Sequence, residues 1–331
     1  MSATHVWIIA AVAFAASTTS AADVRSRSPV VTTLATLGSG SASGSTIGPD
    51  GALYVTDPNA GSVERVDRRT GAVTTLADGL PRAVIGVGGA MDVVFKGRTA
   101  YVLVTLVGGD IIGGPHIGDE TVGIYRLGRD GVFTAIADIG VWSIDHPPTS
   151  DHFITTGVQF ALQRYAHGFL VTDGHHNRVL RVDLDGTVQP VKAFGNIVPT
   201  GLETVGSAVL MTAAGPIPHL PADGKVMAFW PRSKATIELA RGASMLVDVE
   251  HGRGSDIYVL SQGQWDGVAE GSPALPDTGR LLKVDWRGGL EPVLDRYGNE
   301  LVFDRPVSLE ITGNTAYVVG LSGTIVKIEN L

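Results

Sequence analysis

The sequence predicts an all-β fold, a six-bladed β-propeller whose ring is closed by the N-terminal strand pairing into the last blade. Three observations predict it. A cassette of four short strands recurs along the chain, glycine-containing turns separate the strands, and the last cassette stops one strand short while a spare strand precedes the first. A repeat of four strands is typical of propeller blades.

The first cassette shows the pattern most clearly. Ile47-Gly-Pro-Asp-Gly-Ala-Leu-Tyr-Val-Thr56 predicts two strands joined by a tight turn, because glycine and aspartate supply the left-handed backbone conformations that such turns need. A third strand follows over Gly61–Asp67, and a fourth over Ala72–Ala77. Each segment alternates apolar and polar residues with period two, which predicts half-buried β-strands.

The other cassettes repeat these features. Short apolar runs mark the second strands, around Tyr54, Tyr101, Phe169, Val209, Tyr258 and Tyr317. Third strands are expected at Val63–Asp67, Ile124–Leu127, Val179–Asp183, Val226–Phe229, Leu281–Asp285 and Ile325–Ile328. Fourth strands are expected at Val73–Leu76, Val132–Ile136, Val188–Val191, Thr236–Leu239 and Leu290–Leu294. A β-sandwich or a β-helix accounts for these four-strand units less well.

The sixth cassette ends at Leu331, directly after its third strand. The other end of the chain is expected to supply the missing strand, because Val30-Val-Thr-Thr-Leu-Ala-Thr-Leu37 closely resembles Val73-Thr-Thr-Leu-Ala-Asp-Gly-Leu80. This pairing closes the ring and removes an exposed sheet edge.

The composition excludes several classes of function. The net charge of −8 is spread along the chain without a basic stripe, so no nucleic-acid partner is expected. The chain has no cysteine, which excludes disulfides, thiolate metal sites and cysteine nucleophiles. Stability is therefore expected to come from a large packed core.

The N-terminus has the features of a signal peptide. An apolar stretch from Val6 to Ala16 is followed by small residues that suit cleavage after Ala21 or Ala22. No lysine or arginine precedes the stretch, so a plain hydrophobic N-terminus is the other interpretation. The stretch is too short to span a bilayer comfortably, and no stable membrane anchor is expected. We expect a signal peptide over residues 1–22, a propeller domain over 23–331, and a secreted or periplasmic location.

Three segments resemble a known family. Gly48-Pro-Asp-Gly-Ala-Leu-Tyr-Val-Thr-Asp57, Gly123-Ile-Tyr-Arg-Leu127 and Pro199-Thr-Gly-Leu-Glu203 resemble the ScyD/ScyE family of exported propellers, and more loosely the NHL, strictosidine-synthase-like and gluconolactonase-like six-bladed propellers. The resemblance covers essentially the whole mature chain and implies a propeller with a role accessory to secondary-metabolite biosynthesis. Gluconolactonase-like enzymes bind a divalent cation in the central channel through Glu, Asn and Asp. This chain lacks their Asn-bearing motifs at the matching places.

Propeller topology assigns each connection to one face. Connections from strand two to strand three, and from strand four to the next blade, share what we call the first face, and the remaining turns share the second face. The long segments belong to the first face: Gly108–Thr121, Gly140–Thr155, Gly215–Asp223 and Gln262–Thr278. Loops on a rigid scaffold carry most binding and catalytic residues, so the first face is the expected ligand surface.

The first-face loops are rich in histidine and carboxylate side chains, which can move protons or bind metals near neutral pH. His175 and His176, on the turn after the second strand of the third blade, are the candidate catalytic bases. The candidate binding residues are His116, Asp145, His146, His152, His219 and Trp265. A surface or structural role is the other interpretation for each histidine, because none of the spacings forms a known metal motif.

A second candidate site lies at the propeller axis, where the innermost strands direct polar side chains into the channel. The residues in that register are Asp92, Gln159, Glu203, Asp248 and Glu310. Acidic side chains around one axis repel each other unless a cation or protons intervene, so the four carboxylates are candidate ligands of Ca²⁺. Alternatively, they face channel water or bond backbone amides of the neighbouring blade.

Two functions remain open from the sequence. The first is an exported propeller that binds a small molecule, glycan or protein partner on the first face and requires no cofactor. The second is a lactonase-like hydrolase assisted by a divalent cation on the axial carboxylates. The sequence contains no Gly-x-Ser-x-Gly elbow and no phosphate-binding loop to support another mechanism.

Overall fold

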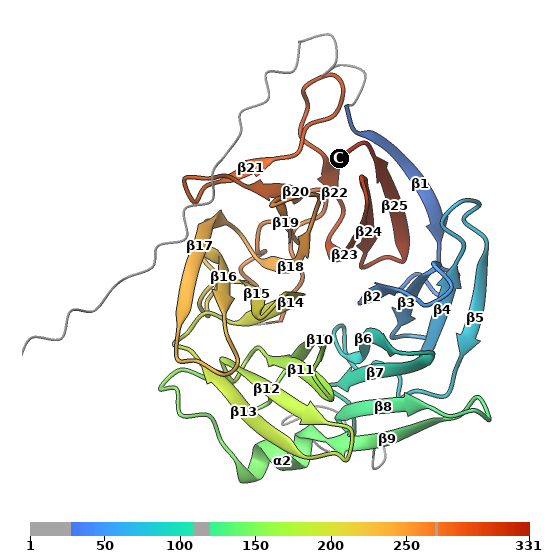
Figure 1. The fold of residues 1–331 in the computed structure, drawn as a ribbon, viewed down its shortest axis with the longest axis vertical. Coiled ribbons are helices and arrows are strands. Elements are labelled where there is room, and N and C mark those ends of the chain that lie inside the picture. The colour runs from blue at the N-terminus through green and yellow to red at the C-terminus, as the bar shows by residue number, and fades with distance from the viewer. Residues whose placement is uncertain (1–27, 109–119, 269–270) are drawn as a thin grey trace, which may run out of the picture.

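The computed structural model describes residues 28–108, 120–268 and 271–331. Six antiparallel sheets surround a central axis (Figure 1). In each sheet the first strand of the cassette lies innermost and the fourth outermost, which is the arrangement of a propeller blade. The predicted fold class, an all-β six-bladed propeller, is confirmed.

The first three blades follow chain order. Blade 1 contains β2 (Ser45–Ile47), β3 (Leu53–Asp57), β4 (Ser62–Val66) and β5 (Val73–Ala77). Blade 2 contains β6 (Gly89–Lys96), β7 (Thr99–Thr105), β8 (Gly123–Leu127) and β9 (Phe133–Asp138). Blade 3 contains β10 (Gln159–Tyr165), β11 (Gly168–Asp173), β12 (Arg178–Asp183) and β13 (Val188–Ala193).

The remaining blades complete the ring. Blade 4 contains β14 (Pro199–Val205), β15 (Ala208–Ala213), β16 (Gly224–Phe229) and β17 (Thr236–Ala243). Blade 5 contains β18 (Leu246–His251), β19 (Ile257–Ser261), β20 (Gly279–Val284), β21 (Leu290–Pro292) and β22 (Val302–Phe303). Blade 6 contains β23 (Pro306–Thr312), β24 (Thr315–Gly320), β25 (Thr324–Glu329) and β1 (Val30–Thr36).

The hydrophobic core lies between the blades. Each of the described apolar clusters joins two neighbouring blades, so that, for example, Leu103 of blade 2 packs in one cluster with Phe169 of blade 3. Second strands such as β3 and β11 are buried along their whole length, because a neighbouring blade covers each side. This burial explains why the second strands read as apolar runs in the sequence.

Ring closure occurs as predicted. β1 pairs antiparallel with β25, with Val31 opposite Ile328 and Thr33 opposite Val326. The side chains of β1 are mostly exposed or half-buried, so its backbone hydrogen bonds contribute more to the closure than side-chain burial does. β25 therefore has a partner on both sides, and the ring is continuous.

Two details differ from the sequence expectations. The fourth strand of blade 5, expected over Leu290–Leu294, is split into β21 and β22. The backbone of Val293 still bonds Leu281 of β20, after which the chain leaves the sheet until β22 returns to pair with β20. A short helix, α2 (Ile139–Asp145), follows β9 and was not predicted. The carboxylate of Asp138 caps its first turn by accepting a hydrogen bond from the backbone of Val141 at 2.8 Å.

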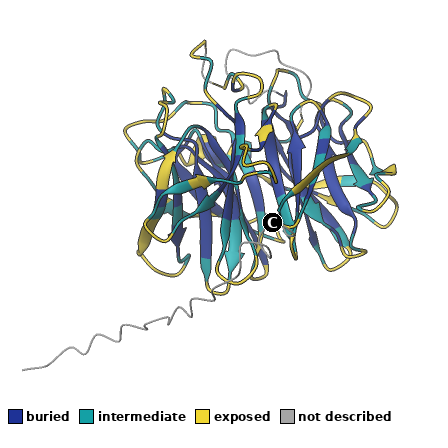
Figure 2. Cartoon of the chain, turned by 90° about the horizontal axis from the view of Figure 1, so that it is seen from above, coloured by how far each residue is buried: buried dark blue, intermediate teal, exposed yellow. Residues whose placement is uncertain are grey.

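The two faces differ in loop length. Among the described connections, 139–158, 214–223 and 262–278 are long, and all lie on the first face, which is the upper side of Figure 2. The turns of the second face are short. The predicted loop Gly108–Thr121 falls mostly outside the described residues. Within the described ranges, no helix has the length and hydropathy of a bilayer-spanning segment.

Candidate functional site

A cavity of about 500 Å³ opens at the first-face end of the axis. We call it the cup. Every blade contributes to its wall through the residue that follows its second strand by one or two positions: Asn59, Leu106, His175, Ala214, Gln262 and Leu321. Because all six follow second strands on the same face, the propeller geometry itself brings them together around the axis. Cavities of this volume are typical of small-molecule sites.

The wall of the cup is mostly apolar and uncharged. Apolar side chains from several blades, among them Met91, Phe160, Val198 and Met245, form much of the lining. Over the described part of the chain, the lining includes no Asp, Glu, Lys or Arg. The cup therefore favours a neutral, largely apolar molecule, since burying an unpaired charge there would be costly.

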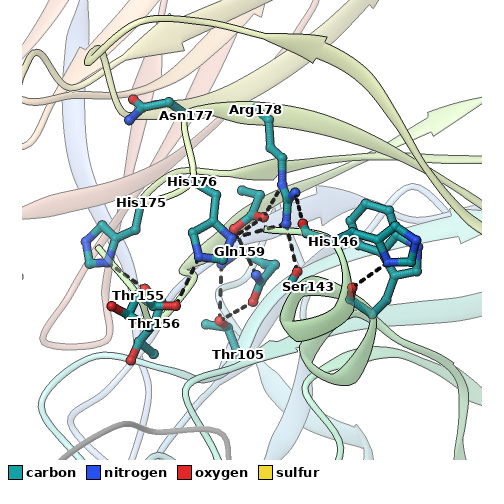
Figure 3. Close-up of polar contacts among 12 residues, drawn as sticks. Thr105, Ser143, His146, Thr155, Thr156, Gln159, His175, His176, Asn177 and Arg178 are labelled. Carbon is teal, nitrogen blue, oxygen red and sulfur yellow. Dashed lines mark hydrogen bonds and ion pairs between the residues drawn. The ribbon is translucent and has the colours of Figure 1, made fainter. Parts of the chain in front are cut away.

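His175 lies in the wall of the cup, as the histidine on the left of Figure 3. Its Nδ1 is 3.2 Å from the backbone carbonyl of Thr156, which can only accept a hydrogen bond. Nδ1 therefore carries the proton, and Nε2 carries the lone pair in the neutral ring. Burial disfavours the charged ring and lowers the pKa of His175, so the imidazole is a neutral acceptor near pH 7.

Gln262 lies in the same wall, on blade 5, and is 8% exposed. Its Oε1 accepts a hydrogen bond from the backbone N–H of Ala274 at 3.0 Å. The amide nitrogen of Gln262 makes no hydrogen bond to the described residues and is a donor at the cup. Sequence reasoning did not select Gln262, although it directly follows the second strand of its blade, much as His175 follows the second strand of blade 3 at two positions.

Two of the candidate binding residues lie together near the cup. His219 lines it, and the ring of Trp265 meets the ring of His219 edge-on, with centroids 5.9 Å apart. Trp265 donates from Nε1 to the hydroxyl of Ser272 at 3.0 Å, and Ser272 is also part of the lining. The structure therefore places His175 and His219 in the wall of one cavity, with Trp265 in contact with His219 and Ser272 of that wall.

His176 points away from the cup into a buried polar cluster (Figure 3). It is 3% exposed, with Nδ1 at 2.9 Å from the carboxylate of Asp173 and Nε2 at 3.2 Å from the carbonyl of Thr155. Arg178 also binds this carboxylate, at 2.8 Å. Both ring nitrogens of His176 are thus engaged by groups that anchor the loop before β10, which fits a structural role.

The carboxylate of Asp173 is the centre of this cluster and is fully buried. Burial alone would raise the pKa of Asp173, but the hydrogen bonds and charges of His176 and Arg178 outweigh it and hold the pKa below its ordinary value. Gln159 donates to the other carboxylate oxygen at 3.0 Å. The prediction that Gln159 lines the axial channel is therefore wrong, because its buried side chain bonds Asp173 and Thr105 in this cluster and is not part of the channel lining.

The other candidate binding residues lie away from the cup. Asp145 and His146 are exposed at the C-terminal end of α2, where the His146 ring stacks on Trp142 with centroids 4.5 Å apart. The His146 carbonyl accepts a hydrogen bond from Arg178 at 2.7 Å. His152 is exposed and its carbonyl accepts from Asn177 at 2.7 Å. His116 lies outside the described residues.

A second cavity of about 290 Å³ follows the axis below the cup. All four candidate metal ligands line it: Asp92, Glu203, Asp248 and Glu310. Glu250 also lines this channel and was missed, although its position two residues after Asp248 on β18 places it on the same side of the strand. The cup and the acidic channel share lining residues where they meet: Ser43, Met91, Phe160, Val247 and Val307.

Two of the axial carboxylates join neighbouring blades. Asp92 accepts a hydrogen bond from the backbone N–H of Leu162 in blade 3 at 2.7 Å, and Asp248 accepts one from Leu309 in blade 6 at 2.7 Å. Each also accepts from the residue that follows it in its own strand, Val93 or Val249. The sequence left open such bonds to backbone amides of the next blade as the alternative to Ca²⁺ binding, and Asp92 and Asp248 make them.

The enclosure of the channel shifts the titration of its acids. Burial, together with the charge of the other channel carboxylates, raises the pKa of Glu250 and Glu310 well above the ordinary value. Burial likewise raises the pKa of Asp92, and raises that of Asp248 to about 7. Within the ranges that the structure describes, no three His, Asp or Glu side chains are grouped closely enough to hold a metal ion. Shared protons are thus one means by which the acids relieve their repulsion.

Comparisons with known proteins support the fold. No family model and no curated protein matches the chain. Among solved structures, the chain is similar to a gluconolactonase from Xanthomonas campestris, with 13% identity, a TM-score of 0.57, and coverage of 93% of this chain and 92% of that one. It is also similar to a PQQ-bound aldose sugar dehydrogenase from Streptomyces coelicolor, with 15% identity, a TM-score of 0.55, and coverage of 92% and 98%.

A third similar structure is a virginiamycin B lyase from Staphylococcus aureus, with 10% identity, a TM-score of 0.52, and coverage of 91% of this chain and 99% of that one. Identities this low show the fold alone. The chain therefore shares its six-bladed propeller fold with these proteins, and membership of the ScyD/ScyE family stays a prediction.

Proposed function

We propose that this protein binds a neutral, largely apolar small molecule in the cup on its first face. The observation that carries the proposal is a cavity of about 500 Å³ to which all six blades contribute and whose described lining has no charged side chain. Pockets that are mostly apolar with a few placed polar groups are the usual small-molecule sites. A ligand of this kind is compatible with the accessory role in secondary metabolism that the ScyD/ScyE resemblance implies.

A pair of glycines offers a matched test. Gly86 lines the cup and Gly195 lies on the same face away from it. At both positions an added Cβ meets no atom within 4 Å, and neither backbone is in the left-handed region. We expect Gly86→Trp to fill the cup without unfolding the chain, and Gly195→Trp to leave the cup open.

The probe is N-phenylnaphthylamine, a neutral fluorescent molecule, compared with its sulfonated counterpart, anilinonaphthalene sulfonate. We expect the neutral probe to bind the unmodified protein and Gly195→Trp equally, and to bind Gly86→Trp at least about tenfold more weakly. The sulfonated probe should bind more weakly than the neutral one, because the lining offers no cation to its charge. Equal binding of the neutral probe to both variants would overturn the proposal.

A second candidate function is catalysis on the bound molecule. It is favoured by His175, whose neutral imidazole presents Nε2 at the cup and could accept a proton there. In the version with a divalent cation, Ca²⁺ would occupy the axial carboxylates, and metal analysis of the purified protein tests that. Turnover of a panel of neutral lactones and esters that disappears in His175→Asn while the neutral probe still binds would establish an enzyme.

We also propose that the chain is exported. The apolar stretch from Val6 to Ala16 and the small residues after it support this. N-terminal sequencing of the protein isolated from its own host should give a mature chain that begins at Ala22 or Asp23. A chain that still begins at Met1 or Ser2 contradicts export by this signal.

A further inference from the structure

Two of the polar side chains in the wall of the cup, Gln262 and His175, have defined and opposite hydrogen-bonding roles. The backbone N–H of Ala274 can only donate, so it fixes which end of the Gln262 amide is oxygen. The NH₂ end of Gln262 is then left as a donor at the cup, on a side chain that is 8% exposed. A donor in this position can give its hydrogen bond to a ligand or to a water molecule in the cup.

The same reasoning assigns the role of His175. The carbonyl of Thr156 can only accept, so it fixes the proton on Nδ1. The neutral ring then offers the lone pair of Nε2, and burial in an uncharged wall keeps the ring neutral. His175 is therefore an acceptor at the cup, as Gln262 is a donor.

The spacing between the donor and the acceptor follows from the repeat. Gln262 follows β19 of blade 5 and His175 follows β11 of blade 3, so the width of blade 4 separates them. Between them blade 4 presents the apolar side chains of Val198 and Ala214, together with the polar side chains of Thr200 and His219. The donor and the acceptor thus lie on either side of the blade 4 part of the wall.

We propose that the ligand of the cup is a neutral molecule with an apolar body, a carbonyl-type acceptor that meets Gln262 and a hydroxyl-type donor that meets His175. This inference rests on the proposed function, since it names the chemistry of the molecule that the cup binds. A carbonyl satisfies the buried amide donor, and a hydroxyl donates to Nε2 of His175. A molecule that lacks one of the two leaves a protein group unpaired, which is how such sites discriminate.

Hydroxybenzophenones supply suitable probes, because they are neutral, are mostly apolar and carry one carbonyl and one hydroxyl. The meta and para isomers provide two spacings. Each is compared with its methoxy derivative, which lacks the donor, and with the corresponding benzylphenol, which lacks the carbonyl. Affinity is measured by displacement of N-phenylnaphthylamine from the full chain, so that only binding in competition with that probe is scored.

Two variants separate the contacts. Gln262→Glu keeps an oxygen for Ala274 and removes the amide donor. His175→Asn keeps an N–H donor for Thr156 and removes Nε2, the acceptor assigned to the cup. The unmodified protein should bind at least one hydroxybenzophenone about tenfold more tightly than either analogue. Gln262→Glu should abolish the preference for the hydroxybenzophenone over the benzylphenol and leave its preference over the methoxy compound. His175→Asn should abolish the preference over the methoxy compound and leave the preference over the benzylphenol.

Two results would overturn the inference, and they are distinguishable from failure of the proposed function. If all compounds bind the unmodified protein equally while Gly86→Trp still excludes them, the cup binds small molecules and the polar pattern is wrong. If both variants retain both preferences, other groups recognise the ligand and the inference is also wrong. If Gly86→Trp binds every compound as the unmodified protein does, the proposed function fails.

Discussion

At the axis, single residues hold neighbouring blades together. Asp92 and Asp248 each accept a backbone hydrogen bond from the next blade, and a glycine of the preceding blade packs against each of them. A Cβ on Gly44 would lie 2.2 Å from the Asp92 carboxylate, and one on Gly201 would lie 2.6 Å from Cα of Asp248. The same glycine–aspartate contact therefore occurs in both halves of the ring.

These contacts predict that even a methyl group at either glycine lowers the stability of the fold. We expect Gly44→Ala or Gly201→Ala to lower the free energy of unfolding by about 1–3 kcal/mol, because the added methyl overlaps backbone atoms that cannot move without shifting a blade. Denaturant titration measures the change. The control is Gly195→Ala, where the methyl meets no atom within 4 Å and the effect should stay within about 0.5 kcal/mol. A Gly44→Ala variant as stable as this control contradicts the packing described.

The channel acids predict a pH dependence whose sign is fixed by their raised pKa values. An acid whose pKa is higher in the folded chain stabilises the fold below its ordinary pKa and loses that contribution as the pH rises through the folded value. Asp248 loses its contribution to the free energy of unfolding between about pH 4 and about pH 7. Glu250 and Glu310 begin to lose theirs near their ordinary pKa of 4.5, and the loss continues at higher pH.

A neutral amide in place of Glu310 should reduce the loss of stability that the channel acids cause at high pH. We expect Glu310→Gln to raise the melting temperature at pH 8 by roughly 2 °C or more, and to change it little at pH 4, where the acid is already protonated. Thermal unfolding at both pH values measures it. The exposed Glu291 of β21 provides the control Glu291→Gln, which should change neither value. A Glu310→Gln variant that is less stable at pH 8 than the unmodified chain would contradict the prediction.

Sequence reasoning placed four axial carboxylates correctly because strand alternation fixes which side chains face the channel. It could not separate His175 from His176, since consecutive residues of a turn are directed by tertiary contacts. The ring of His175 contacts the carbonyl of Thr156 and lies in the cup wall, whereas the ring of His176 contacts Asp173 and Thr155. It also could not foresee that Asp145 and His146 lie at the end of α2, because that helix depends on a single cap at Asp138.

At the scale of elements, the buried cluster around Asp173 fastens the loop between β9 and β10 to blade 3. Arg178 links Asp173 to the hydroxyl of Ser143 in α2 and to the carbonyl of His146. We expect Asp173→Asn to destabilise the fold by about 3 kcal/mol or more, because it leaves the buried Arg178 without its counter-charge. Denaturant titration tests this, with the exposed Asp145→Asn as a control that should be neutral. Equal stability of the two variants would show that the cluster does not fasten the loop.

The closing strand can be tested by a crosslink. Thr32 of β1 lies opposite Lys327 of β25, and the chain has no cysteine of its own. We expect Thr32→Cys combined with Lys327→Cys to form a disulfide on oxidation and to raise the free energy of unfolding by about 2–4 kcal/mol, reversed by reductant. Thr32→Cys alone is the control. Failure of the pair to crosslink would contradict the closure of the ring.

The element pattern was the most predictable part of the molecule. Period-two alternation and glycine turns repeat in every blade, and the match between Val30–Leu37 and Val73–Leu80 pointed to β1. The split of β21 and β22 was not predictable, because it depends on long-range pairing with β20 rather than on local sequence.

At the scale of the whole molecule, the ring contains two stacked chambers of opposite character. The cup on the first face is apolar and uncharged over its described lining, and the channel below it is lined by five acids: Asp92, Glu203, Asp248, Glu250 and Glu310. Met91, Phe160, Val247 and Val307 line both chambers where they meet. The long described loops of this chain all lie on the rim of the cup, so the apolar chamber lies beside the segments that tolerate most variation in sequence.

The central claim, that the cup is the ligand site, is tested most directly by a crystal structure of the protein soaked with a bromobenzophenone. The anomalous signal of bromine locates the molecule independently of the protein chain. We predict a bromine position inside the cup, with the carbonyl of the probe within hydrogen-bonding distance of Gln262. A bromine position in the acidic channel, or on the outer surface beside Asp145 and His152 with the cup empty, would contradict the account.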